Sequence, residues 1–173
     1  MQYIERAEEI TGYRVRIWTR PAFTVVGYTA IVGKDTSAEQ LVRDVTADGR
    51  LEGLIKASAV APWVLGLGSW DPECQGKGDY RYTVCIEETQ HTDFVPLQAQ
   101  FPQHAPFRKR IGASDWMCFE DFDHGGPNAY ELIQRLGYQF HMGTDDIGLH
   151  FDAYPPSVAP FGAAMEFWIT VMR

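Results

Sequence analysis

The sequence carries the same order of secondary-structure patterns twice, and this repetition constrains the fold most strongly. In each half a strand pattern is followed by a helix pattern and then by two more strand patterns. Trp70 and Tyr154 close corresponding strands 84 residues apart, and Tyr82 corresponds to Phe167 at a spacing of 85. Such self-similarity predicts an α+β fold of duplicated β-α-β-β units. Two hairpins that each follow a helix would give similar spacing without duplication.

The first half begins with strand patterns over residues 13–19 and 22–32, in which apolar side chains alternate. Gly27 is expected to form a bend or a bulge in the second of them. Thr36 and Glu39 form a capping-box pattern that predicts the start of a helix, and Gly49 is expected to break or kink it. The remaining patterns of this half are a helix over 50–58 and strands over 63–70 and 80–89.

The second half begins near Trp116, after a proline-containing segment of low periodicity that we predict to be a connection. Pro127 and Asn128 are expected to open a helix. The patterns are a strand over 116–123, a turn over 124–128, a helix over 129–140 and strands over 147–154 and 166–173. The 173 residues suit one domain, since domains commonly span ~100–200 residues. We expect halves of about 13–90 and 114–173, joined by a linker of about 91–113.

Pairing two such units about a pseudo-twofold axis predicts antiparallel sheets covered by helices, with a central ligand cleft between them. The net charge of −8 argues against direct nucleic-acid binding, which depends on Lys and Arg. No apolar run approaches the ~20 residues that span a bilayer, and the acidic start is unlike a signal peptide. We therefore predict a cytoplasmic protein without membrane contacts. The oligomeric state stays open.

No motif indicates a metal or another cofactor. The three cysteines, Cys74, Cys85 and Cys118, show no CxxC spacing. The aspartates and histidine of residues 121–124 resemble a strand-to-helix turn more than a metal site. The glycine-rich segment 66–78 lacks the GK[ST] ending of a phosphate-binding loop, and the HGG sequence at 124–126 has no accompanying GxSxG nucleophile.

Five segments in order resemble the GyrI-like small-molecule-binding domains, also called AraC-type effector-binding domains. They are RPAFTVVGYTAIV, YRYTVCIE, WMCFEDFDHGGPNAYELI, FDAY before a proline pair, and the closing FWITVMR. The resemblance covers nearly the whole chain from Tyr13. It departs from the family pattern at Cys85, where a glycine is usual, and at Glu88, where an apolar residue is frequent. Gly49 and Gly137 also fall inside the helical segments.

The resemblance implies the duplicated fold and a cleft that binds bulky lipophilic, often cationic, compounds. It also implies aromatic walls and a buried glutamate on the central strand. Many members are fused to a DNA-binding module, whereas this sequence starts on the binding domain and ends on its last strand. The resemblance therefore implies a stand-alone member that senses or sequesters its ligand.

The family match selects Glu87 as the carboxylate that faces the ligand. Side chains alternate along a strand, so Glu87 and Glu88 lie on opposite faces, and Thr83 and Cys85 share the face of Glu87. Both glutamates could instead mark the solvated end of a strand. The residues predicted to bind the ligand are Glu87, Trp63, Trp70, Tyr82, Trp116, Glu120, Phe140, Tyr154 and Trp168. Any single aromatic residue among them could equally be part of the core, and Trp18 could serve either role.

Two alternative functions stay open. A branch of stand-alone members hydrolyses cyclopropane-bearing genotoxic natural products, so Glu87 or Glu120 could be a general base. The family name also implies a gyrase-inhibitor-like interaction protein.

Overall fold

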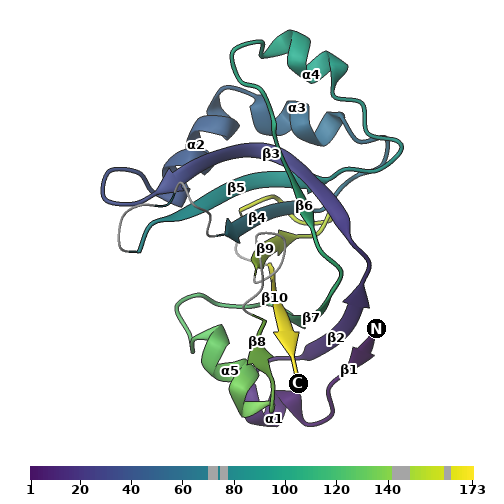
Figure 1. The fold of residues 1–173 in the computed structure, drawn as a ribbon, viewed down its shortest axis with the longest axis vertical. Helices are drawn as coiled ribbons and strands as arrows, with labels where there is room; N and C mark the ends of the chain where they lie inside the picture. The colour runs from purple at the N-terminus through teal and green to yellow at the C-terminus, as the bar shows by residue number, and fades with distance from the viewer. Residues whose placement is uncertain (70–73, 75–77, 142–148, 162–164) are drawn as a thin grey trace.

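A computed structural model describes residues 1–69, 74, 78–141, 149–161 and 165–173 of the chain. The described residues form an α+β fold with five helices and one sheet of ten strands, in which every strand pair is antiparallel. The strand order is β1-β2-β7-β10-β9-β4-β5-β3-β6, and β8 pairs with β10. The sheet is strongly curved (Figure 1).

The strands are β1 (Gln2–Tyr3), β2 (Val15–Arg20), β3 (Phe23–Val32), β4 (Val64–Ser69), β5 (Tyr80–Glu87), β6 (Phe107–Ile111), β7 (Ser114–Phe119), β8 (Gln139–Phe140), β9 (His150–Tyr154) and β10 (Glu166–Met172). The helices are α1 (Ala7–Thr11), α2 (Ala38–Ala47), α3 (Arg50–Lys56), α4 (Val95–Gln100) and α5 (Ala129–Arg135).

The two halves of the chain order their strands alike. In one half the order is β7-β10-β9, in the other it is β3-β5-β4, and the pairing of β9 with β4 joins them. The first half lends β2 to the second, because β2 pairs with β7, and β6, which lies between the two halves in sequence, pairs with β3 of the first half. The segment expected to be a linker therefore contains a strand of the sheet, as well as α4. The duplication itself stays a prediction.

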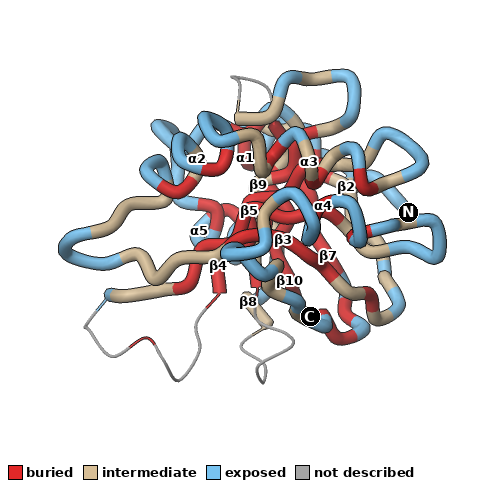
Figure 2. Tube along the Cα trace, turned by 90° about the horizontal axis from the view of Figure 1, so that it is seen from above, coloured by how far each residue is buried: buried red, intermediate tan, exposed pale blue. Residues whose placement is uncertain are grey.

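Helices cover one face of the sheet, which we call the helix face. α2 packs against β3 and β5, and α3 packs against β5 and α4. α5 lies at the other end of the molecule, beside α1 and β8 (Figure 1). Buried side chains from both halves form one apolar cluster on this face, including Val26, Val84, Ile86, Leu54 and Leu132. Figure 2 shows this burial concentrated in the strands, with the outer surfaces of the helices exposed.

The opposite face, which we call the inner face, closes on itself like part of a barrel. Phe23 on β3 contacts Trp116 on β7, with ring centroids 6.1 Å apart, although these strands are far apart in the strand order. Phe151 on β9 packs against both rings. The curvature of the sheet thus creates a second apolar core on the inner face.

Two helix boundaries differ from the prediction. Ser37, not Thr36, caps α2 by accepting a hydrogen bond from the Gln40 backbone N–H at 3.1 Å. The helix after Asn128 ends at Arg135, because Gly137 adopts a φ of 81° that is left-handed and stops the helix. Residues 139–140, predicted to be helical, form β8 instead. Gly49, with a φ of 85°, separates α2 from α3 as predicted.

None of the helices that the structure describes is long and apolar enough to cross a membrane.

Candidate functional site

The structure divides the predicted site residues between the two faces of the sheet. On β5, Tyr82 belongs to the apolar cluster of the helix face and Cys85 to that of the inner face. Alternation therefore sends Glu87 to the inner face with Cys85. A cavity lies on each face, and each contains part of the predicted set.

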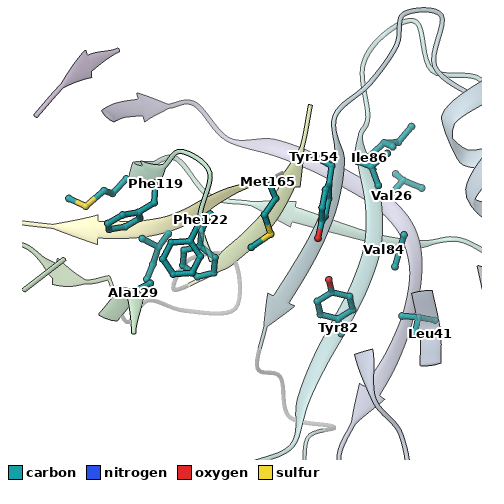
Figure 3. Packing of buried hydrophobic residues seen from close by; sticks show 14 of the residues in the cluster. Val26, Leu41, Tyr82, Val84, Ile86, Phe119, Phe122, Ala129, Tyr154 and Met165 are labelled. Carbon is teal, nitrogen blue, oxygen red and sulfur yellow. The ribbon is translucent and has the colours of Figure 1, made fainter. Parts of the chain in front are cut away.

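The larger of the two, which we call the helix-face cleft, has a volume of about 630 Å³. It lies where the two halves meet, since its walls come from α2, β5 and β9. It is lined by Ala38, Glu39, Val42, Arg43, Tyr80, Tyr82, His124, His150, Asp152, Tyr154 and Phe161. Figure 3 shows the hydroxyls of Tyr82 and Tyr154 directed toward one another. Both tyrosines are among the predicted site residues.

Asp152 supplies the carboxylate of the helix-face cleft. Its side chain is 16% exposed. Its Oδ1 lies 2.9 Å from Nε2 of His124, and its Oδ2 accepts a hydrogen bond from the Tyr82 hydroxyl at 3.3 Å. The hydrogen bond to Asp152 raises the pKa of His124. Burial, with a contribution from the charge of Asp152, raises the pKa of Tyr154 to about 12, and burial also raises that of Tyr82. The tyrosines are therefore neutral hydrogen-bond donors.

Two glycines in β4 make the space for these side chains. A Cβ at Gly66 would lie 2.0 Å from the hydroxyl oxygen of Tyr82, and one at Gly68 would lie 2.3 Å from Nε2 of His150. Glycine inside a strand frequently marks such a close approach. The LGLG sequence of β4 thus allows Tyr82 and His150 to lie flat against the sheet beside Asp152.

His150 forms an uncharged part of the cleft wall. Its ring stacks on Phe167 with centroids 5.4 Å apart, and its Nδ1 lies 3.3 Å from the Tyr130 hydroxyl. Burial lowers the pKa of His150, so the ring is neutral at neutral pH. His124 and His150 also line an adjacent hollow of about 340 Å³ beside α5. The apolar wall therefore continues past Asp152 toward α5.

The second cavity, which we call the tryptophan pocket, lies on the inner face and has a volume of about 430 Å³. Three of the predicted site residues line it: Glu87, Trp63 and Trp168. The full lining is Met1, Arg16, Trp18, Arg20, Ser58, Val60, Ala61, Pro62, Trp63, Leu65, Glu87, Thr89 and Trp168.

An arginine already neutralises the carboxylate of this pocket. Nη2 of Arg20 lies 2.7 Å from Oε2 of Glu87. The same guanidinium lies over the ring of Phe23 at 4.0 Å and over that of Trp168 at 5.7 Å. The aromatic faces and the carboxylate that were expected to hold a ligand cation are thus in contact with the protein's own cation. Glu88, on the opposite face, pairs with Arg108.

The remaining predicted residues lie outside both cavities or outside the described residues. Trp116 is fully buried between Phe23 and Phe151. Glu120 lines neither cavity and accepts hydrogen bonds from Arg16 at 2.5 Å and from the Tyr3 hydroxyl at 2.7 Å. Phe140 packs edge-on against Tyr130 at 5.0 Å. Trp70 lies outside the residues that the structure describes.

Asp152 and His150 are not among the predicted site residues, and the sequence predicts His124 only as part of a turn. A signal for Asp152 exists, because an acidic residue inside an apolar strand that alternates with His150 and Tyr154 is unusual. The contacts among Asp152, Tyr82 and His124 depend on the pairing of β9 with β4, which local patterns do not encode. In the part of the chain that the structure describes, no cluster of three or more His, Cys, Asp or Glu residues could hold a metal ion.

The fold is shared with solved structures of low sequence identity. SAV2435, solved with bound tetraphenylphosphonium, matches with a TM-score of 0.56 and 13% identity, over 99% of this chain and 94% of that one. EcmrR, solved in a complex with DNA, matches with a TM-score of 0.51 and 16% identity, over 98% of this chain and 61% of that one. A hydrolase from Listeria innocua matches with a TM-score of 0.50 and 11% identity, over 91% of each chain.

No family model and no curated protein sequence matches this chain. At these identities the structural likeness shows the fold and nothing further. It confirms the α+β architecture that the resemblance to GyrI-like domains implied.

Proposed function

We propose that the protein binds bulky lipophilic cations in the helix-face cleft, with Asp152 facing the positive charge. The observation that carries the proposal is a largely buried carboxylate in a cavity of about 630 Å³ walled by Tyr80, Tyr82, Tyr154 and Phe161. Ligand pockets commonly span ~300–1,000 Å³ and combine apolar walls with a few polar groups. A cation that stacks on such rings also gains ~0.5–2 kcal/mol from their π-electrons.

The partner of Asp152 favours this cleft over the tryptophan pocket as the cation site. His124 can lose its proton near neutral pH and leave the carboxylate free for a ligand. Arg20, the partner of Glu87, keeps its charge at every physiological pH. A ligand cation at Glu87 would have to displace the guanidinium of Arg20. A ligand cation at Asp152 requires only that His124 loses its proton.

The shared fold supports the proposal, since SAV2435 was solved with bound tetraphenylphosphonium, a lipophilic cation. This chain would accordingly sense or sequester such compounds.

The first prediction tests Asp152 directly. Asp152→Asn should weaken binding of tetraphenylphosphonium by about 10- to 100-fold, because hydrogen bonds and ion pairs to a buried charge contribute ~1.5–3 kcal/mol. Isothermal titration calorimetry measures the change. The asparagine keeps the shape of the side chain and an acceptor for Tyr82, so the fold is retained. Glu87→Gln, on the opposite face, serves as the matched control and should leave the affinity within about twofold.

Triphenylphosphine oxide is the matched neutral ligand. It has similar aromatic bulk without the net charge, so Asp152→Asn should not weaken its binding. If the wild-type protein binds neither compound, or if Glu87→Gln reduces phosphonium affinity and Asp152→Asn does not, the assignment to the helix-face cleft is wrong.

The second prediction concerns pH. The pKa of His124 is raised by Asp152, so below that pKa the imidazolium occupies the carboxylate. Above it the carboxylate is free, and a bound cation disfavours reprotonation of the ring. Phosphonium affinity should therefore rise as pH increases through a range above about 6.5, the ordinary histidine value. His124→Gln should flatten this dependence. Glu39, Arg43 and His150 line the same cleft, and the charge of Asp123 acts on His124, so an unchanged pH dependence of the affinity in His124→Gln would assign the titration to another group.

The same geometry supports one alternative. Asp152 with the hydroxyls of Tyr82 and Tyr154 offers a general base and two hydrogen-bond donors in one apolar cleft. In this alternative a water oxygen attacks an activated cyclopropane carbon, Asp152 takes the water proton, and the ring carbon–carbon bond breaks toward an electron-accepting group that the Tyr82 hydroxyl protonates. The proton on Asp152 then passes to Tyr82 along their hydrogen bond and restores both side chains. Mass spectrometry after incubation with a cyclopropane-bearing alkylator would show a product heavier by one water. An unchanged compound supports binding alone.

A further inference from the structure

We propose that the helix-face cleft and the hollow beside α5 form one binding site with two chambers, and that the ligand carries an uncharged aromatic arm that enters the second chamber. We call this second chamber the α5 chamber, and its walls include the rings of Phe122, His124, Tyr130, His150 and Phe167. The arm is an addition to the proposed function and rests on it, since the cationic part of the ligand is taken to be bound at Asp152.

The two chambers meet at a pair of histidines. His124 and His150 line both cavities, which have volumes of about 630 Å³ and about 340 Å³. His124 is also the partner of Asp152, with 2.9 Å between its Nε2 and Oδ1 of the carboxylate. A cation bound to Asp152 therefore lies one side chain away from the α5 chamber. The side chain of His124 is 58% exposed, so a flexible spacer can pass over it without displacing buried atoms.

The aromatic rings of the α5 chamber have two orientations. The ring of Phe167 stacks on that of Phe122, with centroids 4.9 Å apart and planes at 29°, and on that of His150, at 5.4 Å and 25°. The His124 ring stands at 87° to both phenylalanines, and the Tyr130 ring stands at 85° to His150. An inserted ring can thus stack on some of these side chains and meet others edge-on, which are the two favoured arrangements of aromatic pairs.

These rings are held in place before a ligand arrives. Phe122 and Phe167 are buried. The hydroxyl of Tyr130 lies 3.3 Å from Nδ1 of His150, and the Tyr130 ring packs edge-on against Phe140, with centroids 5.0 Å apart. A preorganised aromatic surface loses little entropy when a ring binds to it, so the α5 chamber is suited to increase the affinity of a ligand that reaches it.

The charges of the α5 chamber favour an arm without a charge. The described residues that line it include no Asp, Glu, Lys or Arg. Burial lowers the pKa of His150 and raises that of Tyr130, so both side chains are neutral near neutral pH. His124 loses its proton when a cation takes its place at Asp152. A charged arm would therefore leave water without gaining a counter-ion, whereas a plain aromatic arm needs none.

Two phosphonium ions that differ by one ring test for the arm. Butyltriphenylphosphonium carries no ring on its alkyl chain, and phenylbutyl-triphenylphosphonium carries one at the end of the same chain. The phenylbutyl ion should bind the wild type roughly tenfold more tightly, the scale of stacking one ring on aromatic side chains. The cyclohexylbutyl analogue, which has similar bulk but no flat ring, should bind less tightly than the phenylbutyl ion. Isothermal titration calorimetry measures all three affinities.

Variants of Tyr130 show whether the added ring lies in the α5 chamber. Tyr130 lines this chamber but not the helix-face cleft. Tyr130→Ala should therefore reduce the affinity ratio of the phenylbutyl ion to the butyl ion from roughly tenfold to about threefold or less. Tyr130→Phe keeps the ring and should keep the ratio. Tyr3→Ala removes a tyrosine of comparable exposure that lines neither chamber, and it should leave the ratio unchanged.

The two-chamber site is overturned if the wild type binds the butyl and phenylbutyl ions equally well, or if the cyclohexylbutyl analogue binds as tightly as the phenylbutyl ion. It is also overturned if Tyr130→Ala keeps the wild-type ratio. In each of these cases, binding of the butyl ion that is weakened by Asp152→Asn still supports the proposed function. If neither ion binds, or if Asp152→Asn weakens neither, the proposed function is wrong and the arm is wrong with it. The comparison on the wild type needs no variant, so it decides the question even if Tyr130→Ala does not fold.

Discussion

Gly27→Ala is expected to lower the free energy of unfolding by more than about 3 kcal/mol. A Cβ at Gly27 would lie 1.9 Å from the carbonyl oxygen of Val84 and 2.6 Å from Cα of Cys85. Both atoms belong to the backbone of β5, so no side-chain movement can relieve the contact. Overpacking that side chains can absorb already costs ~1–3 kcal/mol. Here the strands must separate, and β3 is held by β5 on one side and by β6 on the other.

Urea denaturation measures this effect as a lower midpoint with an unchanged slope. Gly53→Ala in α3 is the matched control. Its Cβ would meet the Cδ1 end of Leu97 at 2.6 Å, a flexible contact, and alanine is favoured over glycine in a helix by ~1 kcal/mol. The control should unfold near the wild-type midpoint. If Gly27→Ala also did so, the close approach of β3 to β5 would be wrong.

Gly27 also shows that local sequence patterns do not predict contacts between strands that are far apart in the sequence. The sequence indicated a bend or a bulge, but the register from Val25 opposite Glu87 to Val32 opposite Tyr80 is unbroken. The glycine is needed because a neighbouring backbone approaches it, which depends on strands more than 50 residues apart. The alternation within β5 was predicted correctly, because the two-residue period of a strand fixes the face of every side chain.

The segment 91–113 was misjudged for a physical reason. Pro96 occupies the first turn of α4, where a missing N–H costs nothing, so proline there does not exclude a helix. β6 is an edge strand whose arginines are exposed or paired with charges, so it lacks the apolar alternation that marks a strand. The prolines and charges of this segment are typical of a connection, although α4 and β6 are both part of the fold.

The residue types of the candidate site could be predicted from the sequence, but which of these residues lie together could be predicted only in part. The resemblance to GyrI-like domains implied aromatic walls and a carboxylate, and each of the two cavities has both. Tyr82 and Asp152 meet because β4 lies between β5 and β9 and carries glycines at the crossing. Glu87 meets Arg20 because the chain turns back after β2. These long-range neighbours decide which carboxylate is open to a cation.

Arg16→Met is expected to destabilise the protein by about 3–5 kcal/mol at neutral pH. The guanidinium is 11% exposed and lies 2.5 Å from an oxygen of Glu120 and 2.5 Å from one of Glu166, which are 17% and 16% exposed. Removing one member of a buried charge network leaves the others without compensation, and this loss typically costs that much. Methionine preserves the apolar stem. Urea denaturation gives the change in unfolding free energy.

The pH dependence of this loss separates charge from packing. Burial raises the pKa of Glu120, but hydrogen bonds from Tyr3 and Arg16 outweigh it and hold the pKa below its ordinary value. That carboxylate therefore stabilises the wild type above its unfolded pKa of ~4.3, and the contribution is lost as pH falls further. In Arg16→Met, Glu120 lacks this partner and less is lost when it is protonated, so the gap in unfolding free energy between variant and wild type should narrow as the pH falls below about 4.3. Arg14→Met removes a 60% exposed arginine 3.5 Å from the same Glu120 and should cost only ~0–1 kcal/mol. A gap that stays constant with pH would mean that Arg16 acts through packing on Trp18 rather than through its charge.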